Sequence, residues 1–100
     1  MANTPEGKVK DKINRTLEAY GAYRYMPVSN GMGTAALDYI CCHKGHFFSI
    51  EAKAPGKKPT VRQQHTQRVL EHHGARVFII DGDCTELAFY LAGLSDGTAN

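Results

Sequence analysis

The period of the hydrophobic pattern changes along the chain and predicts an alternation of helices and strands. In residues 5–20, apolar side chains recur every three or four positions, as on the buried face of a helix. These apolar residues are Val9, Ile13, Leu17 and Tyr20. Thr4 and Pro5 are typical of a helix start and Gly21 of a helix end, so we expect the first helix over residues 5–20.

Two later segments have patterns typical of strands. In residues 22–28 aromatic residues alternate with others, up to the break expected at Pro27. Residues 75–80 form the short apolar run of a buried strand. A longer segment between them, residues 37–53, predicts a hairpin.

Two further helices complete the predicted order. Thr60 is placed as an N-cap with Gln63 at the capping-box position, and this helix runs to His73. A last short helix is expected over residues 85–94. The chain should therefore be an α/β domain with a mixed central sheet flanked by helices, in which the helix after Thr60 is a right-handed crossover between two strands.

The predicted hairpin places two carboxylates opposite each other. β-branched and aromatic residues flank Lys44-Gly45, a turn dipeptide in which glycine readily adopts positive φ. A turn centred there pairs residues whose numbers sum to 89, so Asp38 faces Glu51. Lys53 lies two residues beyond Glu51 and therefore shares its face.

Such a cluster of charges is unfavourable unless a cation is bound. Like charges opposite each other destabilise a sheet, and oxygen ligands of this kind suit Mg²⁺. The pattern D…ExK therefore indicates a candidate metal-dependent nuclease site. The alternative is a surface hairpin with an ordinary Glu-x-Lys pair. A register slip of one residue would send Asp38 to the other face.

Glu6 and Gln63 are candidate additions to this site, and each has a structural alternative. Glu6 lies in the first turn of the first helix, where it can reach the sheet or simply stabilise the helix dipole. Gln63 lies near the end of the Glu-x-Lys strand, and a site role would add to its role in the cap.

Composition limits the class of protein. The chain has 100 residues, 42% of them hydrophobic, which is enough for one small domain over residues 1–100. It has no apolar run of bilayer-spanning length and no apolar core of a signal peptide near its start. We therefore expect a cytoplasmic protein.

The net charge of +2 does not by itself indicate nucleic-acid binding, but the distribution of charge is uneven. The charged residues from position 81 onward are all acidic. Basic residues form two groups, the second of which adjoins the candidate site. The groups are Lys8, Lys10, Lys12 and Arg15, and then Lys53, Lys57, Lys58, Arg62 and Arg68.

The cysteines favour a reduced protein. There are 3, an odd number, and Cys41 and Cys42 are neighbours on a strand, so they point to opposite faces. The same geometry disfavours an alternative zinc site, because these two thiols do not readily share one tetrahedral ion and no CxxC pair is present. The remaining ligands of that alternative would come from His43, His46, His72, His73 or Cys84.

Taken together, the order and spacing of these residues resemble the VRR-NUC family of the PD-(D/E)xK nuclease superfamily, in particular its small stand-alone phage-type members. The resemblance rests on Glu6, Asp38, Glu51-Ala52-Lys53 and Gln63, and on the segment GHFFSIEAKAPGKKPTVRQ. It implies a restriction-endonuclease-like αβββαβ core. The sequence departs from the family in one place, since Ala35-Ala36-Leu37-Asp38 replaces the usual Gly-x-Pro-Asp.

The resemblance also implies roles. Asp38, Glu51 and the backbone carbonyl of Ala52 would bind Mg²⁺ or Mn²⁺, with Glu6 able to reach the ion through water. Lys53 would position the attacking water, and Gln63 would support the site. The implied reaction is hydrolysis of a DNA phosphodiester by an endonuclease selective for branched or junction DNA. The DNA backbone would be held by Lys57, Lys58 and Arg62.

Two further expectations follow. A domain this small offers little surface for a duplex, and related small nucleases act as homodimers, so we expect a homodimer in a bacterial or phage-infected host cell. The alternative function is a catalytically silent DNA-binding module with the same fold.

Overall fold

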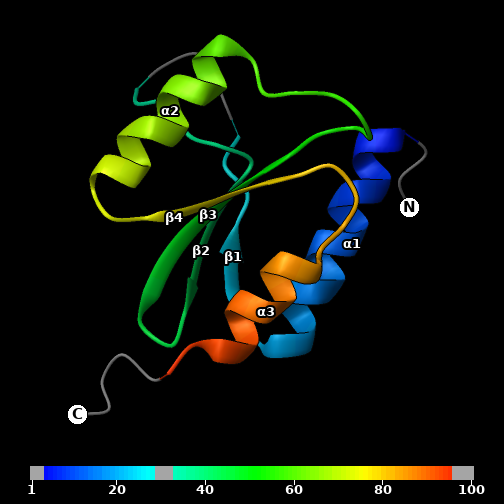
Figure 1. Cartoon of the computed structure of the whole chain (residues 1–100), viewed down its shortest axis with the longest axis vertical. Coiled ribbons are helices and arrows are strands. Elements are labelled where there is room, and N and C mark those ends of the chain that lie inside the picture. Colours follow the sequence, from blue (N-terminus) through cyan, green and yellow to red (C-terminus); the bar gives the residue numbers. More distant parts are fainter. Residues whose placement is uncertain (1–3, 29–32, 96–100) are drawn as a thin grey trace.

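The structure is a computed structural model that describes residues 4–28 and 33–95, and it has the predicted order of elements (Figure 1). A sheet lies between α2 on one face and α1 with α3 on the other. The elements are α1 (Pro5–Tyr20), β1 (Tyr23–Tyr25), β2 (Tyr39–His43), β3 (His46–Ala52), α2 (Val61–His72), β4 (Arg76–Ile80) and α3 (Thr85–Gly93). None of the helices described is both long and apolar enough to cross a membrane.

The helix ends follow the predicted capping chemistry. The Thr4 hydroxyl accepts a hydrogen bond from the Gly7 amide at 3.0 Å, and Gly21 ends α1 with a φ of 70°. Thr60 and Gln63 form the capping box of α2. These local signals therefore fix where α1 and α2 begin relative to the sheet.

The sheet has the order β1-β2-β3-β4 and is mixed, with β1–β2 and β2–β3 antiparallel and β3–β4 parallel. The hairpin register is the predicted one, since Tyr39 pairs with Ile50 and His43 with His46. Lys44 and Gly45 form its turn with φ values of 50° and 83°. Both positive values match the turn that suits a two-residue hairpin.

The first strand is shorter than predicted. Residues 22–28 were expected to form it, but only Tyr23–Tyr25 pair with β2. Pro27 has no amide hydrogen to donate to the ladder, and it restricts the residue before it. The strand therefore ends at Tyr25, two residues before Pro27.

The main core lies on the α1 and α3 side of the sheet. Side chains of β2 and β3 meet those of α1, α3 and β4 there, and Tyr39, Phe48 and Ile50 are fully buried. The Tyr39 hydroxyl donates to Asn14 Oδ1 at 2.8 Å and lies 3.3 Å from the carbonyl oxygen of Lys10. This contact fixes α1 against the start of β2.

The opposite face carries the chemistry. Because side chains alternate along a strand, Ser49 and Glu51 of β3 point away from the main core, toward the side covered by α2 (Figure 1). Cys41 is buried in the main core and Cys42 is exposed, as expected for neighbours on a strand. Glu51 thus lies near the C-terminal end of β3, under the N-terminal part of α2.

Candidate active site

Two hydrogen bonds cross the hairpin at Asp38, one to the Glu51 carboxylate and one from the Ala52 amide. The Asp38 amide donates to Glu51 Oε1 at 3.2 Å, and the Ala52 amide donates to Asp38 Oδ2 at 2.9 Å. Each carboxylate is therefore held by the backbone of the partner strand, at the point where β2 begins and β3 ends. The predicted juxtaposition of these two residues is present.

Lys53 and Gln63 complete the surroundings of Glu51. The Lys53 amide donates to the Ile80 carbonyl at 2.8 Å, and its ammonium lies 3.8 Å from Glu51 Oε2. Gln63 donates from Nε2 to the same oxygen at 2.6 Å. Its Oε1 accepts from the Thr60 amide at 2.9 Å, so one side chain serves both the helix cap and the site.

The environment of Glu51 disfavours its negative charge. This residue is only 3% exposed. Burial, followed by the charge of Asp38, raises the pKa of Glu51 to about 7, although the ammonium of Lys53 acts in the opposite direction. A buried carboxylate beside a second one, with a pKa shifted this far, is typical of a functional site.

Glu6 reaches this cluster through another residue, which the sequence did not single out as part of the site. Its carboxylate lies 3.5 Å from the Lys10 ammonium, which in turn lies 3.9 Å from Asp38 Oδ1. In the sequence, Lys10 stands out only as a member of the first basic group. The available signal was its spacing, since it follows Glu6 by one helical turn.

The donor atoms fit a hard divalent cation better than zinc. Asp38 and Glu51 offer carboxylate oxygens, and Ala52 lies directly beside them with a backbone carbonyl. Across residues 4–28 and 33–95, no three His, Cys, Asp or Glu side chains gather closely enough to hold an ion. A metal bound here would therefore depend on these two carboxylates, the Ala52 carbonyl and water.

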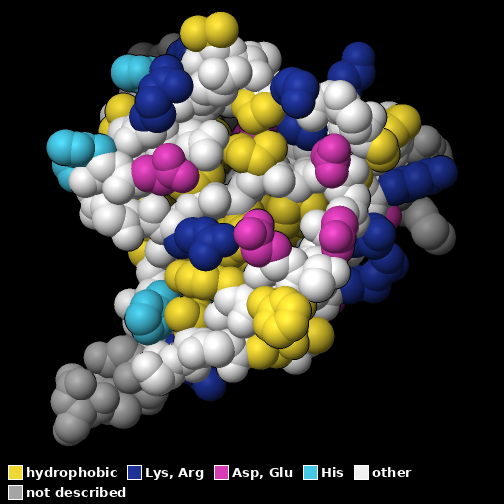
Figure 2. Space-filling model, in the orientation of Figure 1, with side chains coloured by type: hydrophobic (Ala, Val, Ile, Leu, Met, Phe, Trp, Pro, Cys, Tyr) yellow, Lys and Arg dark blue, Asp and Glu magenta, His cyan; other side chains and the backbone are white. Residues whose placement is uncertain are grey.

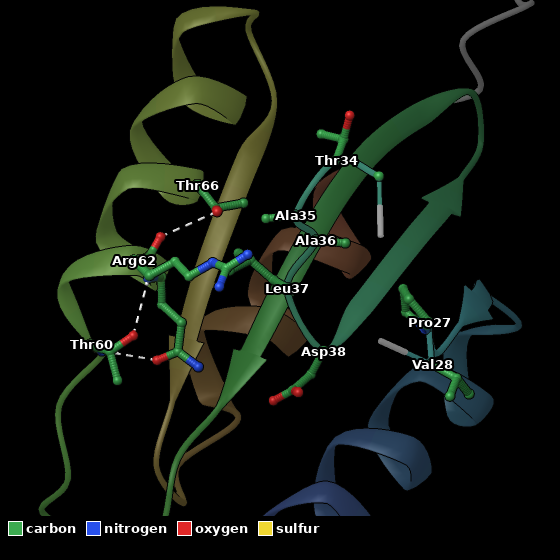
Figure 3. Close-up of a pocket in the computed structure, with 12 residues that line it drawn as sticks. Pro27, Val28, Thr34, Ala35, Ala36, Leu37, Asp38, Thr60, Arg62 and Thr66 are labelled. Carbon is green, nitrogen blue, oxygen red and sulfur yellow. Dashed lines mark hydrogen bonds between the residues drawn. The ribbon is translucent and has the colours of Figure 1, made fainter. Parts of the chain in front are cut away.

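A cavity of about 370 Å³ opens beside Asp38 (Figure 3). Its walls come from the segment before β2 and from the first turns of α2. In the close-up, the Arg62 side chain extends from α2 toward the segment that carries Ala35 and Leu37. The cavity is thus lined by Asp38 on one side and by the basic Arg62 and by Gln63 on the other.

Basic side chains also surround the site on the outer surface. Lys57 and Lys58 are exposed in the loop that leads into α2. Figure 2 shows Lys and Arg side chains gathering over α2, over this loop and over α1. His65 and His72 on α2, and His73 at its C-cap, are exposed to solvent.

A solved structure described as "VRR_NUC domain" matches this chain with a TM-score of 0.74, at 22% sequence identity. The match covers 93% of this chain and 100% of the other. The chain has the VRR_NUC fold. The predicted α/β core of restriction-endonuclease type is thereby confirmed. No family model matches the sequence, and a search of curated proteins finds no match.

Within the VRR_NUC fold, the state of Glu51 predicts a pH dependence for the metal-free protein. A carboxyl with an ordinary pKa of 4.5 when unfolded and about 7 when folded binds more protons in the folded state between these values. The free energy of unfolding should therefore fall by about 3 kcal/mol as the pH rises across this window, relative to Glu51→Gln. Urea unfolding from pH 4 to 8 in chelator measures the difference, and parallel curves for the two proteins would contradict it.

The double role of Gln63 predicts that its cap can be kept while its contact with Glu51 is lost. Gln63→Glu retains an acceptor for the Thr60 amide but places a third carboxylate against Glu51. In chelator at pH 8, it should lower the free energy of unfolding by about 1–3 kcal/mol. Val61→Glu adds the same charge at an exposed position in the same turn of α2 and is the matched control. Equal unfolding midpoints for the two variants would show that Gln63 is not coupled to Glu51.

Proposed function

We propose that this protein is a divalent-metal-dependent nuclease that hydrolyses DNA phosphodiester bonds. The observation that carries the proposal is the pairing of half-buried Asp38 with buried Glu51, held through backbone amides and accompanied by Lys53. Folding does not require a second carboxylate beside the buried Glu51, whereas a metal site does. The resemblance of the sequence to VRR-NUC nucleases and the VRR_NUC fold of the chain support the same function.

The proposed ligands of Mg²⁺ or Mn²⁺ are Asp38, Glu51 and the Ala52 carbonyl. When bound, such an ion supplies positive charge for a phosphoryl oxygen and lowers the pKa of a coordinated water. Gln63 holds Glu51 in place through its 2.6 Å hydrogen bond. The Lys53 ammonium, only 13% exposed, orients the attacking water and stabilises the negative charge that develops on the phosphate.

We propose that the DNA lies across the basic surface beside the site. Lys57, Lys58 and Arg62 contact phosphates without reading bases, so selectivity comes from the shape of the DNA, with branched or junction DNA as the preferred substrate. The cavity beside Asp38 gives room for the nucleotide next to the scissile phosphate. A homodimer would present two such sites to two strands.

Cleavage of supercoiled plasmid and of a synthetic four-way junction in Mg²⁺ or Mn²⁺ tests the proposed activity. Wild type should cut, and Glu51→Gln and Lys53→Ala should each reduce the rate by about a hundredfold or more, because one removes a ligand charge and the other the cation beside the reacting phosphate. Lys44→Ala, at the exposed far turn of the hairpin, should cut normally. DNA that stays intact with wild type, but is bound equally by the variants, would favour a silent DNA-binding module.

The basic loop predicts a salt-dependent DNA affinity. Replacing both Lys57 and Lys58 with alanine should weaken binding and reduce the slope of log K against log salt concentration by about 2, because two phosphate contacts are lost. Fluorescence anisotropy with a catalytically inactive Glu51→Gln background gives both quantities. Lys44→Ala in that background is the control. A slope unchanged by the double substitution would mean that Lys57 and Lys58 do not contact the DNA phosphates.

A further inference from the structure

Lys10 faces the one oxygen of Asp38 that is not held by the sheet. Asp38 Oδ2 accepts from the Ala52 amide at 2.9 Å, whereas Oδ1 lies 3.9 Å from the Lys10 ammonium. The second carboxylate has a parallel arrangement, because the Lys53 ammonium lies 3.8 Å from Glu51 Oε2. Each carboxylate of the pair therefore has its own lysine, and the two lysines come from different elements.

The packing of α1 sets the position of Lys10. Its carbonyl oxygen lies 3.3 Å from the hydroxyl of Tyr39, the residue directly after Asp38. The neighbouring Val9 is only 3% exposed, so this turn of α1 is fixed in the core. Glu6 holds the ammonium from the preceding turn at 3.5 Å. Lys10 is thus directed at Asp38 by the same contacts that attach α1 to the sheet.

The geometry is that of an ion pair that separates easily. A distance of 3.9 Å exceeds a hydrogen bond, and the side chains of Lys10 and Asp38 are 30% and 26% exposed. Pairs of this kind contribute little to stability. A helix-stabilising role would require only the spacing of four residues between Glu6 and Lys10, and it does not account for the position of Asp38.

We propose that Lys10 is an internal counter-ion that neutralises Asp38 in the metal-free protein and competes with the divalent cation for it. This inference rests on the proposed metal-dependent function. When the cation binds, the ammonium leaves Oδ1 and stays beside the site through its pair with Glu6. Lys10 therefore sets how tightly the site holds metal, and it is a positioning residue for the carboxylate.

The test is a calorimetric titration of the full chain with Mn²⁺, without DNA, which needs no activity. Lys10→Met should bind Mn²⁺ about two- to fivefold more tightly than wild type, the change expected from removing a partly exposed ion pair. Lys8→Met, on an exposed position of the same helix, should match wild type, and Lys10→Arg should also match it because the charge is retained. Equal or weaker binding by Lys10→Met overturns the inference.

The outcomes separate this inference from the proposed function. Wild type that binds Mn²⁺ with the same affinity as Lys10→Met refutes the role of Lys10 and leaves the metal site intact. Wild type without saturable Mn²⁺ binding refutes the metal-dependent function and the inference with it. Circular dichroism in chelator verifies that each variant is folded, and Lys10→Gln replaces Lys10→Met if the latter is not.

Glu6→Gln tests whether Glu6 acts through Lys10. Without its carboxylate, Lys10 pairs more fully with Asp38, so Mn²⁺ binding should weaken in the wild-type background and stay unchanged in the Lys10→Met background. Equal weakening in both backgrounds would mean that Glu6 acts on the cation itself, and the tethering part of the inference would fail.

Discussion

The reciprocal hydrogen bonding of Asp38 and Glu51 is the constraint on which the site depends. Each carboxylate accepts a backbone amide from the other strand, so the pair exists only in one hairpin register. The helices then supply what the pair lacks, with Gln63 donating from α2 and Lys10 facing it from α1. The fold thus holds two negative charges together and places one lysine ammonium near each of them, Lys10 near Asp38 and Lys53 near Glu51.

Much of this arrangement could be predicted from the sequence because the decisive signals are local. The turn at Lys44-Gly45 fixes the register, and the caps at Thr4 and Thr60 fix two helix starts. Those features sufficed to place Asp38 opposite Glu51 and Gln63 near its end of β3. The part that Lys10 takes could not be predicted in the same way, because it depends on how α1 packs against β2 through Tyr39.

The short β1 is a second feature that the sequence did not predict correctly. The residue pattern typical of a strand continues beyond Tyr25, where the pairing with β2 ends. The pattern does not show how far before Pro27 the strand must stop. Likewise, the sequence indicates that Gln63 is a cap residue, but only the position of α2 over β3 brings its amide to Glu51. Site residues that lie on one hairpin can thus be predicted from the sequence. Site residues that lie on separate helices can be identified only once the tertiary structure is known.

The hairpin also has a consequence for the order of folding events. Asp38 and Glu51 are 13 residues apart, joined by a two-residue turn, whereas Lys10 is 28 residues from Asp38 and meets it only after α1 docks. Short loops close at lower entropic cost than long ones, so we expect the strand pairing to form first. The chain would then bring its two acids together before the helices dock, with Lys53, the residue directly after β3, as the cation nearest to Glu51 in sequence. Folding of this domain therefore pairs its two acids while both are still in water, and the larger electrostatic cost, the burial of Glu51, comes when the helices dock and bring Gln63 and Lys10 to the pair.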